Sequence, residues 1–170
     1  MGYWGYYVVA RTGRPLTEFD ALDGVREELT LLEERAGQWQ VWECPGGSGD
    51  RTRDIGSMNA LAAQTGAPAL FAYVMDSRCA VIEAAAPDSG TWTACLGRAA
   101  AATFIGGDER ALEDYFLPPR DAAERAVTWA AEGGLTRVAK PLADVLAAPA
   151  EPSAEELFFR FLDRLGVIAR

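Results

Sequence analysis

Residues 69–96 read ALFAYVMDSRCAVIEAAAPDSGTWTACL, and this stretch decides the fold class. An almost continuous apolar run ends at the tight connection Asp76-Ser77-Arg78, and a second apolar segment ends at the turn Pro87-Asp88-Ser89-Gly90. Short apolar segments separated by such turn residues are typical of neighbouring strands joined by tight turns. We therefore predict three consecutive antiparallel strands over 69–76, 79–85 and 91–96.

Two more strands are predicted on the N-terminal side of this stretch. Residues 2–11 are rich in Tyr, Trp and Val and end at the turn signal Thr12-Gly13-Arg14-Pro15. Apolar residues occupy both faces of this segment, which favours a central position in the sheet. In residues 38–44, Trp39, Val41 and Glu43 alternate with Gln40, Trp42 and Cys44, so the two sets would point to opposite faces of a second strand.

Two helices are predicted between these strands. Thr17 is a candidate N-cap for a helix over 17–36, and Gly37 would end it. This helix would bury a stripe at helical spacing, formed by Leu22, Val25, Leu29, Leu32 and Ala36. A shorter helix is predicted over 54–65, with Gly66 just beyond its end.

The C-terminal third changes to the period of a helix, with segments predicted over 108–116, 120–132, 138–146 and 153–165. Ser153 and Glu156 have the spacing of a capping box ahead of the last one. Most predicted strands come first in the sequence and most predicted helices come last. This order predicts an α+β fold, with a mostly antiparallel sheet of about five strands packed by helices. We predict an α+β domain over 1–146, a short Pro/Ala linker over 147–152, and a C-terminal helix over 153–170 docked on the same domain.

Composition narrows the class of protein. The chain has 170 residues, and no apolar run approaches the roughly 20 residues of a membrane-spanning helix. No secretory signal is recognisable at the N-terminus. The three cysteines, Cys44, Cys79 and Cys95, lack a C-x-x-C spacing, as expected of reduced thiols in a cytoplasm. A single lysine against many arginines indicates a high-GC bacterium.

The charge is negative and unevenly distributed. The net charge is −9, and residues 1–50 carry 4 basic and 9 acidic residues. Such a field repels phosphate backbones, so general nucleic-acid binding is disfavoured and a basic protein is the expected partner. The sequence does not predict an oligomeric state.

The four carboxylates Asp20, Asp23, Glu27 and Glu34 would lie opposite the apolar stripe of the predicted helix 17–36. One interpretation is the solvated side that any surface helix has. The other is a surface that binds a basic protein. Both interpretations require these side chains to be exposed.

The chain contains no histidine. This excludes histidine-dependent nucleophile pairs and histidine-containing metal sites, and we predict no catalytic residue, metal site or cofactor. Cys44 near Arg51 and Arg53 is either a reactive thiol or a buried core residue. Glu43, Asp76 and Glu83 border apolar strands and are the best candidates for acid–base chemistry, unless they mark solvent-facing turns.

The glycine-rich stretch 46–53 supports an alternative function. A loop between a strand and a helix is the context in which backbone amides hold a phosphate, and Ser48, Arg51 and Arg53 would assist. The stretch matches neither of the common phosphate-binding motifs. The alternative is therefore a small-molecule binding protein or enzyme that holds an anionic ligand at this loop.

The segments 4–11, 40–46 and 76–81 resemble small acidic proteins of high-GC bacteria. In size and acidity the chain also resembles immunity proteins, which neutralise toxins. This resemblance transfers no functional residue, but it implies a binding role. The leading hypothesis is a non-catalytic cytoplasmic protein, of immunity or regulatory type, that engages a basic partner.

Overall fold

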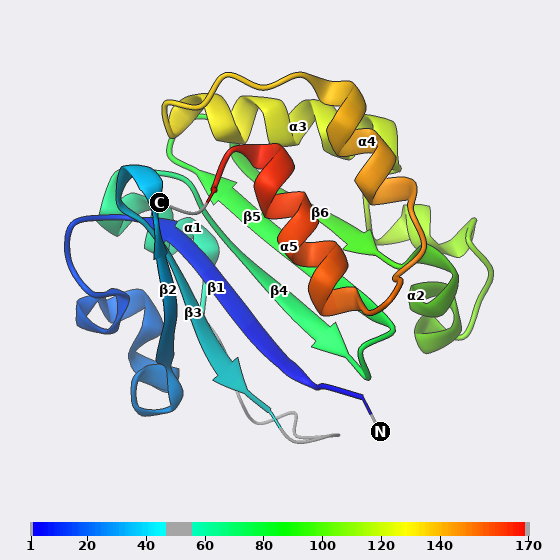
Figure 1. Ribbon diagram of the computed structural model, residues 1–170, viewed down its shortest axis with the longest axis horizontal. Helices are drawn as coiled ribbons and strands as arrows, with labels where there is room; N and C mark the ends of the chain where they lie inside the picture. The colour runs from blue at the N-terminus through cyan, green and yellow to red at the C-terminus, as the bar shows by residue number, and fades with distance from the viewer. Residues whose placement is uncertain (1, 47–55, 169–170) are drawn as a thin grey trace.

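The computed structural model describes residues 2–46 and 56–168. These residues form one open sheet of six antiparallel strands in the order β2-β3-β1-β4-β5-β6 (Figure 1). The strands are β1 (Gly5–Arg11), β2 (Thr30–Arg35), β3 (Trp39–Pro45), β4 (Ala69–Met75), β5 (Cys79–Ala86) and β6 (Gly90–Leu96). The α+β class and the antiparallel sheet are confirmed, with one strand, β2, more than predicted.

Strand β1 lies at the centre of the sheet, between β3 and β4. Val8 is the register partner of Trp42 on one side and of Phe71 on the other. Val8 and Val9 point to opposite faces, and both side chains are fully buried. The apolar residues on both faces of this segment thus correspond to a strand covered on both sides.

Helices cover both faces of the sheet. The α-helices are α1 (Met58–Thr65), α2 (Arg98–Ile105), α3 (Pro119–Glu132), α4 (Ala139–Ala147) and α5 (Ala154–Leu165). Short 3-10 segments are η1 (Leu16–Glu18), η2 (Asp20–Glu28), η3 (Ala36–Gln38) and η4 (Ala111–Asp114). Helices α3, α4 and α5 lie on one face, here called the first face, and α1 lies behind the sheet (Figure 1).

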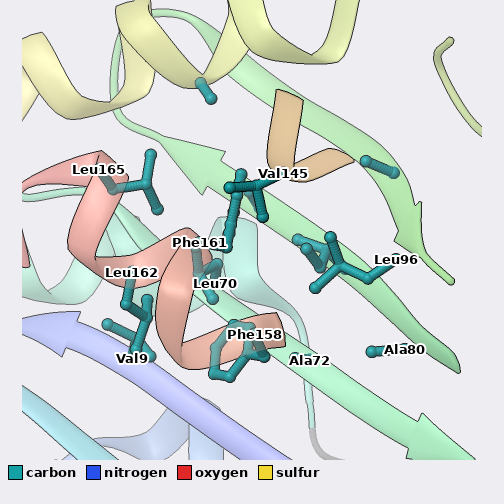
Figure 2. Packing of buried hydrophobic residues seen from close by; sticks show 14 of the residues in the cluster. Val9, Leu70, Ala72, Ala80, Leu96, Val145, Phe158, Phe161, Leu162 and Leu165 are labelled. Carbon is teal, nitrogen blue, oxygen red and sulfur yellow. The ribbon is translucent and has the colours of Figure 1, made fainter. Parts of the chain in front are cut away.

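The first face carries the larger core cluster. Figure 2 shows Phe158, Phe161 and Leu165 of α5 directed at the sheet, where Leu70 and Ala72 meet them. Alanines at several sheet positions leave room for these large side chains, because protein interiors are packed to near crystal density. Helix α5 begins at the predicted cap, since the Ser153 side chain accepts a hydrogen bond from the amide of Glu156 at 3.3 Å.

The second face is covered by η1, η2 and α1. Leu16, Leu22 and Val25 of the two 3-10 segments pack with Met58 and Leu61 of α1 against the sheet. Helix α1 starts at Ser57, whose side chain accepts from the Ala60 amide at 3.2 Å, and it ends at Gly66 in the left-handed region. Helix α2 and η4 cover a separate part of the second face, around Cys79 and Cys95.

The predicted helix over 17–36 is wrong. The chain forms η1 and η2, and then turns extended at Leu29 and continues as the edge strand β2. The first three positions of the predicted stripe are buried as expected, but Leu32 and Ala36 are exposed. Gly24 and Thr30 weaken a helix here, and pairing with β3 satisfies backbone groups that would otherwise lie at the sheet edge.

Two other boundaries differ from the sequence prediction. The segment predicted as helix over 108–116 contains only the short η4. Helix α2 was not predicted, because its alanine-rich sequence lacks a contrast between apolar and polar faces. The predicted helix over 54–65 corresponds to α1, and residues 54–55 lie outside the described residues.

Candidate functional site

The four carboxylates predicted to bind a partner do not share one helical face. Asp20, Asp23 and Glu27 lie on η2, whereas Glu34 lies on β2. All four residues are exposed. Asp23 also pairs with Arg26 at 3.1 Å, so part of its charge is compensated. The acidic helix face is therefore replaced by an acidic surface that passes from η2 onto the edge of the sheet.

Two adjacent leucines lie within this acidic surface. Leu31 is 42% exposed and Leu32 is 45% exposed. They follow the exposed Glu27 and Glu28 and precede Glu34. We call these five residues the acidic leucine edge. The helical spacing of the sequence predicts a buried Leu32 and does not reveal this pair, although Leu31 lies off the predicted stripe.

Both leucines lie on an edge strand that contains a β-bulge. Leu31 pairs with Trp42 and Glu33 pairs with Val41, so Leu32 is opposite no residue of β3. Among the described residues, strand β2 has a neighbouring strand on one side only (Figure 1). In a regular strand that is half buried, adjacent side chains alternate between core and solvent. The extra residue interrupts this alternation at Leu32, and Thr30, Leu31 and Leu32 are all exposed.

The two edges of the sheet differ. Edge strand β6 is covered, because the amide of Leu117 donates to the carbonyl of Thr93 at 3.0 Å. Thr93 Oγ1 also donates to the carbonyl of Tyr115, and Arg125 donates to the carbonyl of Thr91. The acidic leucine edge thus lies on the edge of the sheet opposite the covered one.

Buried groups fix both ends of this edge. At its N-terminal side, Leu22 and Val25 of η2 are buried in the second-face core. At its C-terminal side, Arg35 is buried and donates to the carbonyl of Val167 at 2.6 Å and to Asp163 at 3.3 Å. Arg35 also pairs with Glu33. A surface held by rigid elements loses little conformational entropy when it binds a partner.

The alternative ligand site cannot be placed. Ser48, Arg51 and Arg53 lie outside the described residues. On the described flank before the loop, the amide of Gly46 donates to the carbonyl of Trp4 at 3.1 Å. Binding of an anion at this loop stays a prediction.

The cysteine thiols lie in the core. Cys44, Cys79 and Cys95 are all buried. Burial raises the pKa of Cys79 to about 12, and the neighbouring Cys95 adds to this effect. Burial also raises the pKa of Cys95. A thiol is nucleophilic only as the thiolate, so these two groups are inert near neutral pH.

Two of the candidate acid–base residues, Glu43 and Asp76, form hydrogen bonds with the N-terminal segment. Glu43 accepts a hydrogen bond from the Tyr3 hydroxyl at 2.7 Å, and Asp76 accepts from the amide of Gly2 at 2.8 Å. Burial raises the pKa of Tyr3, and the hydrogen bond to Glu43 raises it further. These bonds fasten the chain before β1 to β3 and to the β4–β5 turn.

A hollow of about 580 Å³ lies beside the β4–β5 turn, the start of α2 and the segment after α4. It contains charged side chains of both signs, namely Asp76, Arg78, Arg98, Glu109 and Glu151. This mixture favours no single class of ligand. In the part of the chain that the structure describes, no three Cys, Asp or Glu side chains are grouped in a way that could hold a metal ion. Likewise, no helix among the described residues is long and apolar enough to cross a membrane.

Comparison with protein-family models, with curated proteins and with solved structures gave no match.

Proposed function

We propose that this protein is a non-catalytic binding protein that captures a basic protein partner at the acidic leucine edge. The observation that carries the proposal is the adjacent exposure of Leu31 and Leu32 among carboxylates on the less covered edge of the sheet. Isolated exposed leucines are common, but two adjacent exposed leucines flanked in sequence by exposed carboxylates have the arrangement of an apolar centre with a polar rim.

The two kinds of side chain would contribute differently to binding. Leu31 and Leu32 would be the apolar centre of the contact, where burial away from water supplies most of the affinity. Glu27, Glu28 and Glu34 would form the rim, where exposed charges mainly raise the association rate and select partners of opposite sign. Asp20 extends the negative surface along η2, and the net charge of −9 adds long-range attraction for a basic protein.

The role that fits best is that of an immunity-type or regulatory protein in the cytoplasm. The resemblance to acidic immunity proteins supports this role, and so does the absence of histidine from the sequence. The buried thiols with raised pKa values agree with a role in which chemistry is not required.

A crosslinking experiment tests the proposal. A photoreactive amino acid at position 31 should capture a basic protein in the source cytoplasm, with products of neighbouring genes examined first. The purified partner is then titrated against the wild-type protein and three double variants. Leu31→Ser with Leu32→Ser should weaken binding at least about tenfold, because two apolar contacts are lost.

Charge reversal provides a matched pair of variants. Glu27→Lys with Glu28→Lys should weaken binding and reduce its dependence on salt. Glu113→Lys with Asp114→Lys changes the net charge equally at two adjacent exposed residues elsewhere, and should keep the wild-type affinity within about twofold. Equal weakening by both pairs, or unchanged binding by the serine variant, would show that the acidic leucine edge is not the interface.

A further inference from the structure

A second exposed surface has the opposite charge. A groove of about 660 Å³ lies between α4 and α5, on the first-face side of the molecule and away from β2 (Figure 1). Its lining consists of Val138, Lys140, Pro141, Asp144, Val145, Ala148, Arg160 and Arg164. We call it the basic groove, because three cations and one carboxylate line it in a protein whose net charge is −9.

The packing of α5 explains why two arginines point into this groove. Phe158, Phe161 and Leu165 are fully buried against the sheet and α4. Arg160 and Arg164 are four residues apart, so they lie one above the other on the outward side of the same helix. Both residues are exposed.

The cations of the groove are weakly compensated within the protein. Lys140 pairs with Asp144 at 3.4 Å, but their side chains are 85% and 66% exposed, so the pair contributes little. Arg160 donates to the carbonyl of Glu151, which carries no net charge. Just beyond Arg164, the guanidinium of Arg137 lies against Gly166, where an added Cβ would be 2.6 Å from its Nε. The like charges gathered here would be stabilised by an anionic partner.

The floor of the groove is apolar. Val138 is 68% exposed at one end, and Pro141, Val145 and Ala148 continue the floor along α4. A small anion would gain nothing from this floor and would stay hydrated among such exposed cations. An amphipathic helix suits both the cations and the apolar floor of the groove, because it presents an apolar stripe with acidic residues beside it.

We propose that the basic groove docks a short acidic amphipathic helix of a second protein partner. Helix α4 spans nine residues, about 13 Å, so the groove accommodates two to three turns of such a helix. A nucleic acid fits less well, because a continuous phosphate backbone would meet Asp144 and the overall negative field. The protein would then bind a basic partner and an acidic one at separate surfaces. This proposal stands on different residues from the proposed function.

A synthetic peptide tests the proposal. The probe is a capped 14-residue helix of Glu, Ala and Leu with its leucines on one face, titrated by NMR against the isotope-labelled full chain. Amide shifts should concentrate in 138–148 and 160–166 and leave 27–34 unchanged. A peptide of the same composition, with its leucines spread around the helix, should bind at least about fivefold more weakly, because it cannot cover the floor.

Variants separate specific docking from general attraction. Arg160→Glu with Arg164→Glu should weaken binding of the probe at least about tenfold. Arg110→Glu with Arg120→Glu makes the same change in net charge at exposed residues elsewhere, and it should change the affinity for the probe less than about twofold. Should the first variant unfold, Arg160→Gln with Arg164→Gln replaces it and should weaken the probe at least about threefold.

Several results would overturn the proposal. Helix docking would be refuted if both arginine pairs lose affinity equally or if the amide shifts lie outside the groove. It would also be refuted if the two peptides bind equally well, or if millimolar inorganic phosphate displaces the probe. Glu27→Lys with Glu28→Lys should leave the probe affinity within about twofold, so failure of the proposed function and failure of this inference are distinguishable.

Discussion

The two faces of the sheet are covered in different ways. On the first face, α3, α4 and α5 bury large aromatic side chains, and Trp129 donates from its Nε1 to the carbonyls of Ala69 and Ala85 at 3.1 Å each. On the second face, the 3-10 segments η1 and η2 precede β2 and pack beside the short α1. Full helices satisfy most of their own backbone groups, whereas short 3-10 segments depend on tertiary contacts.

The two faces therefore differ in their contribution to stability and to the position of the acidic leucine edge. We expect the first face to supply most of the stability, because its core cluster is the larger one and contains several fully buried aromatic residues. The second face positions the acidic leucine edge through a few buried leucines and valines.

The largest effect is expected at Phe161, which is fully buried beneath α5 (Figure 2). Phe161→Ala should lower the free energy of unfolding by about 3–5 kcal/mol, because it removes a large apolar side chain and leaves a cavity. Urea denaturation followed by tryptophan fluorescence measures this change. A cost below about 1 kcal/mol would mean that the first face does not dominate stability.

Leu22 tests the second face. Its side chain is fully buried in η2, and Leu22→Ala should cost about 2–3 kcal/mol. Hydrogen exchange should show faster opening of 16–29 than in the wild-type protein, with α5 amides affected less. If α5 and η2 lose protection equally, the two faces unfold as one unit and the comparison fails.

Local chemistry explains which elements were predictable. The start of α5 was predicted within one residue because Ser153 caps the helix through a hydrogen bond to the amide of its near neighbour Glu156. The β4–β5 turn was predictable for the same reason, since Asp76 and Ser77 adopt the positive φ angles of a tight turn. By contrast, residues 30–35 form a strand by pairing with β3, a segment outside their own local pattern, which indicated a helix.

The candidate site was predictable only in part. The sequence identified four exposed carboxylates, and the structure places all four at the surface. Their grouping depended on a helix that does not form, so Leu31 and Leu32 were missed. The basic groove was also missed, because Lys140 and Arg164 approach each other through the packing of two helices that are separated by a connecting segment.

The pH dependence of stability gives a smaller test within the first face. Burial raises the pKa of Tyr7 to about 12, with added effects from Glu43 and Glu155. Above the ordinary value of 10.0 the unfolded chain loses this proton while the folded chain keeps it, so stability should fall as pH rises from about 10 to about 12. In Tyr7→Phe the fall of the free energy of unfolding with pH should be less steep, by an amount that corresponds to the release of up to about one proton.

Melting temperatures between pH 8 and pH 11.5 measure that slope. Tyr115→Phe is the matched control, because Tyr115 is 62% exposed, and it should give the wild-type slope. If Tyr7→Phe also gives the wild-type slope, Tyr7 does not govern alkaline unfolding.

The smallest effect on stability is expected where function is proposed. Leu31→Ser with Leu32→Ser should lower the free energy of unfolding by no more than about 1 kcal/mol, because Leu31 is already 42% exposed and Leu32 is 45% exposed. Leu29→Ala is the control in the same segment, since Leu29 is only 8% exposed, and it should cost at least about 2 kcal/mol. Urea denaturation of the three proteins provides the comparison. A cost above about 2 kcal/mol for the serine pair would assign both leucines to the folded core, and weaker partner binding by that variant would then reflect unfolding rather than loss of a contact.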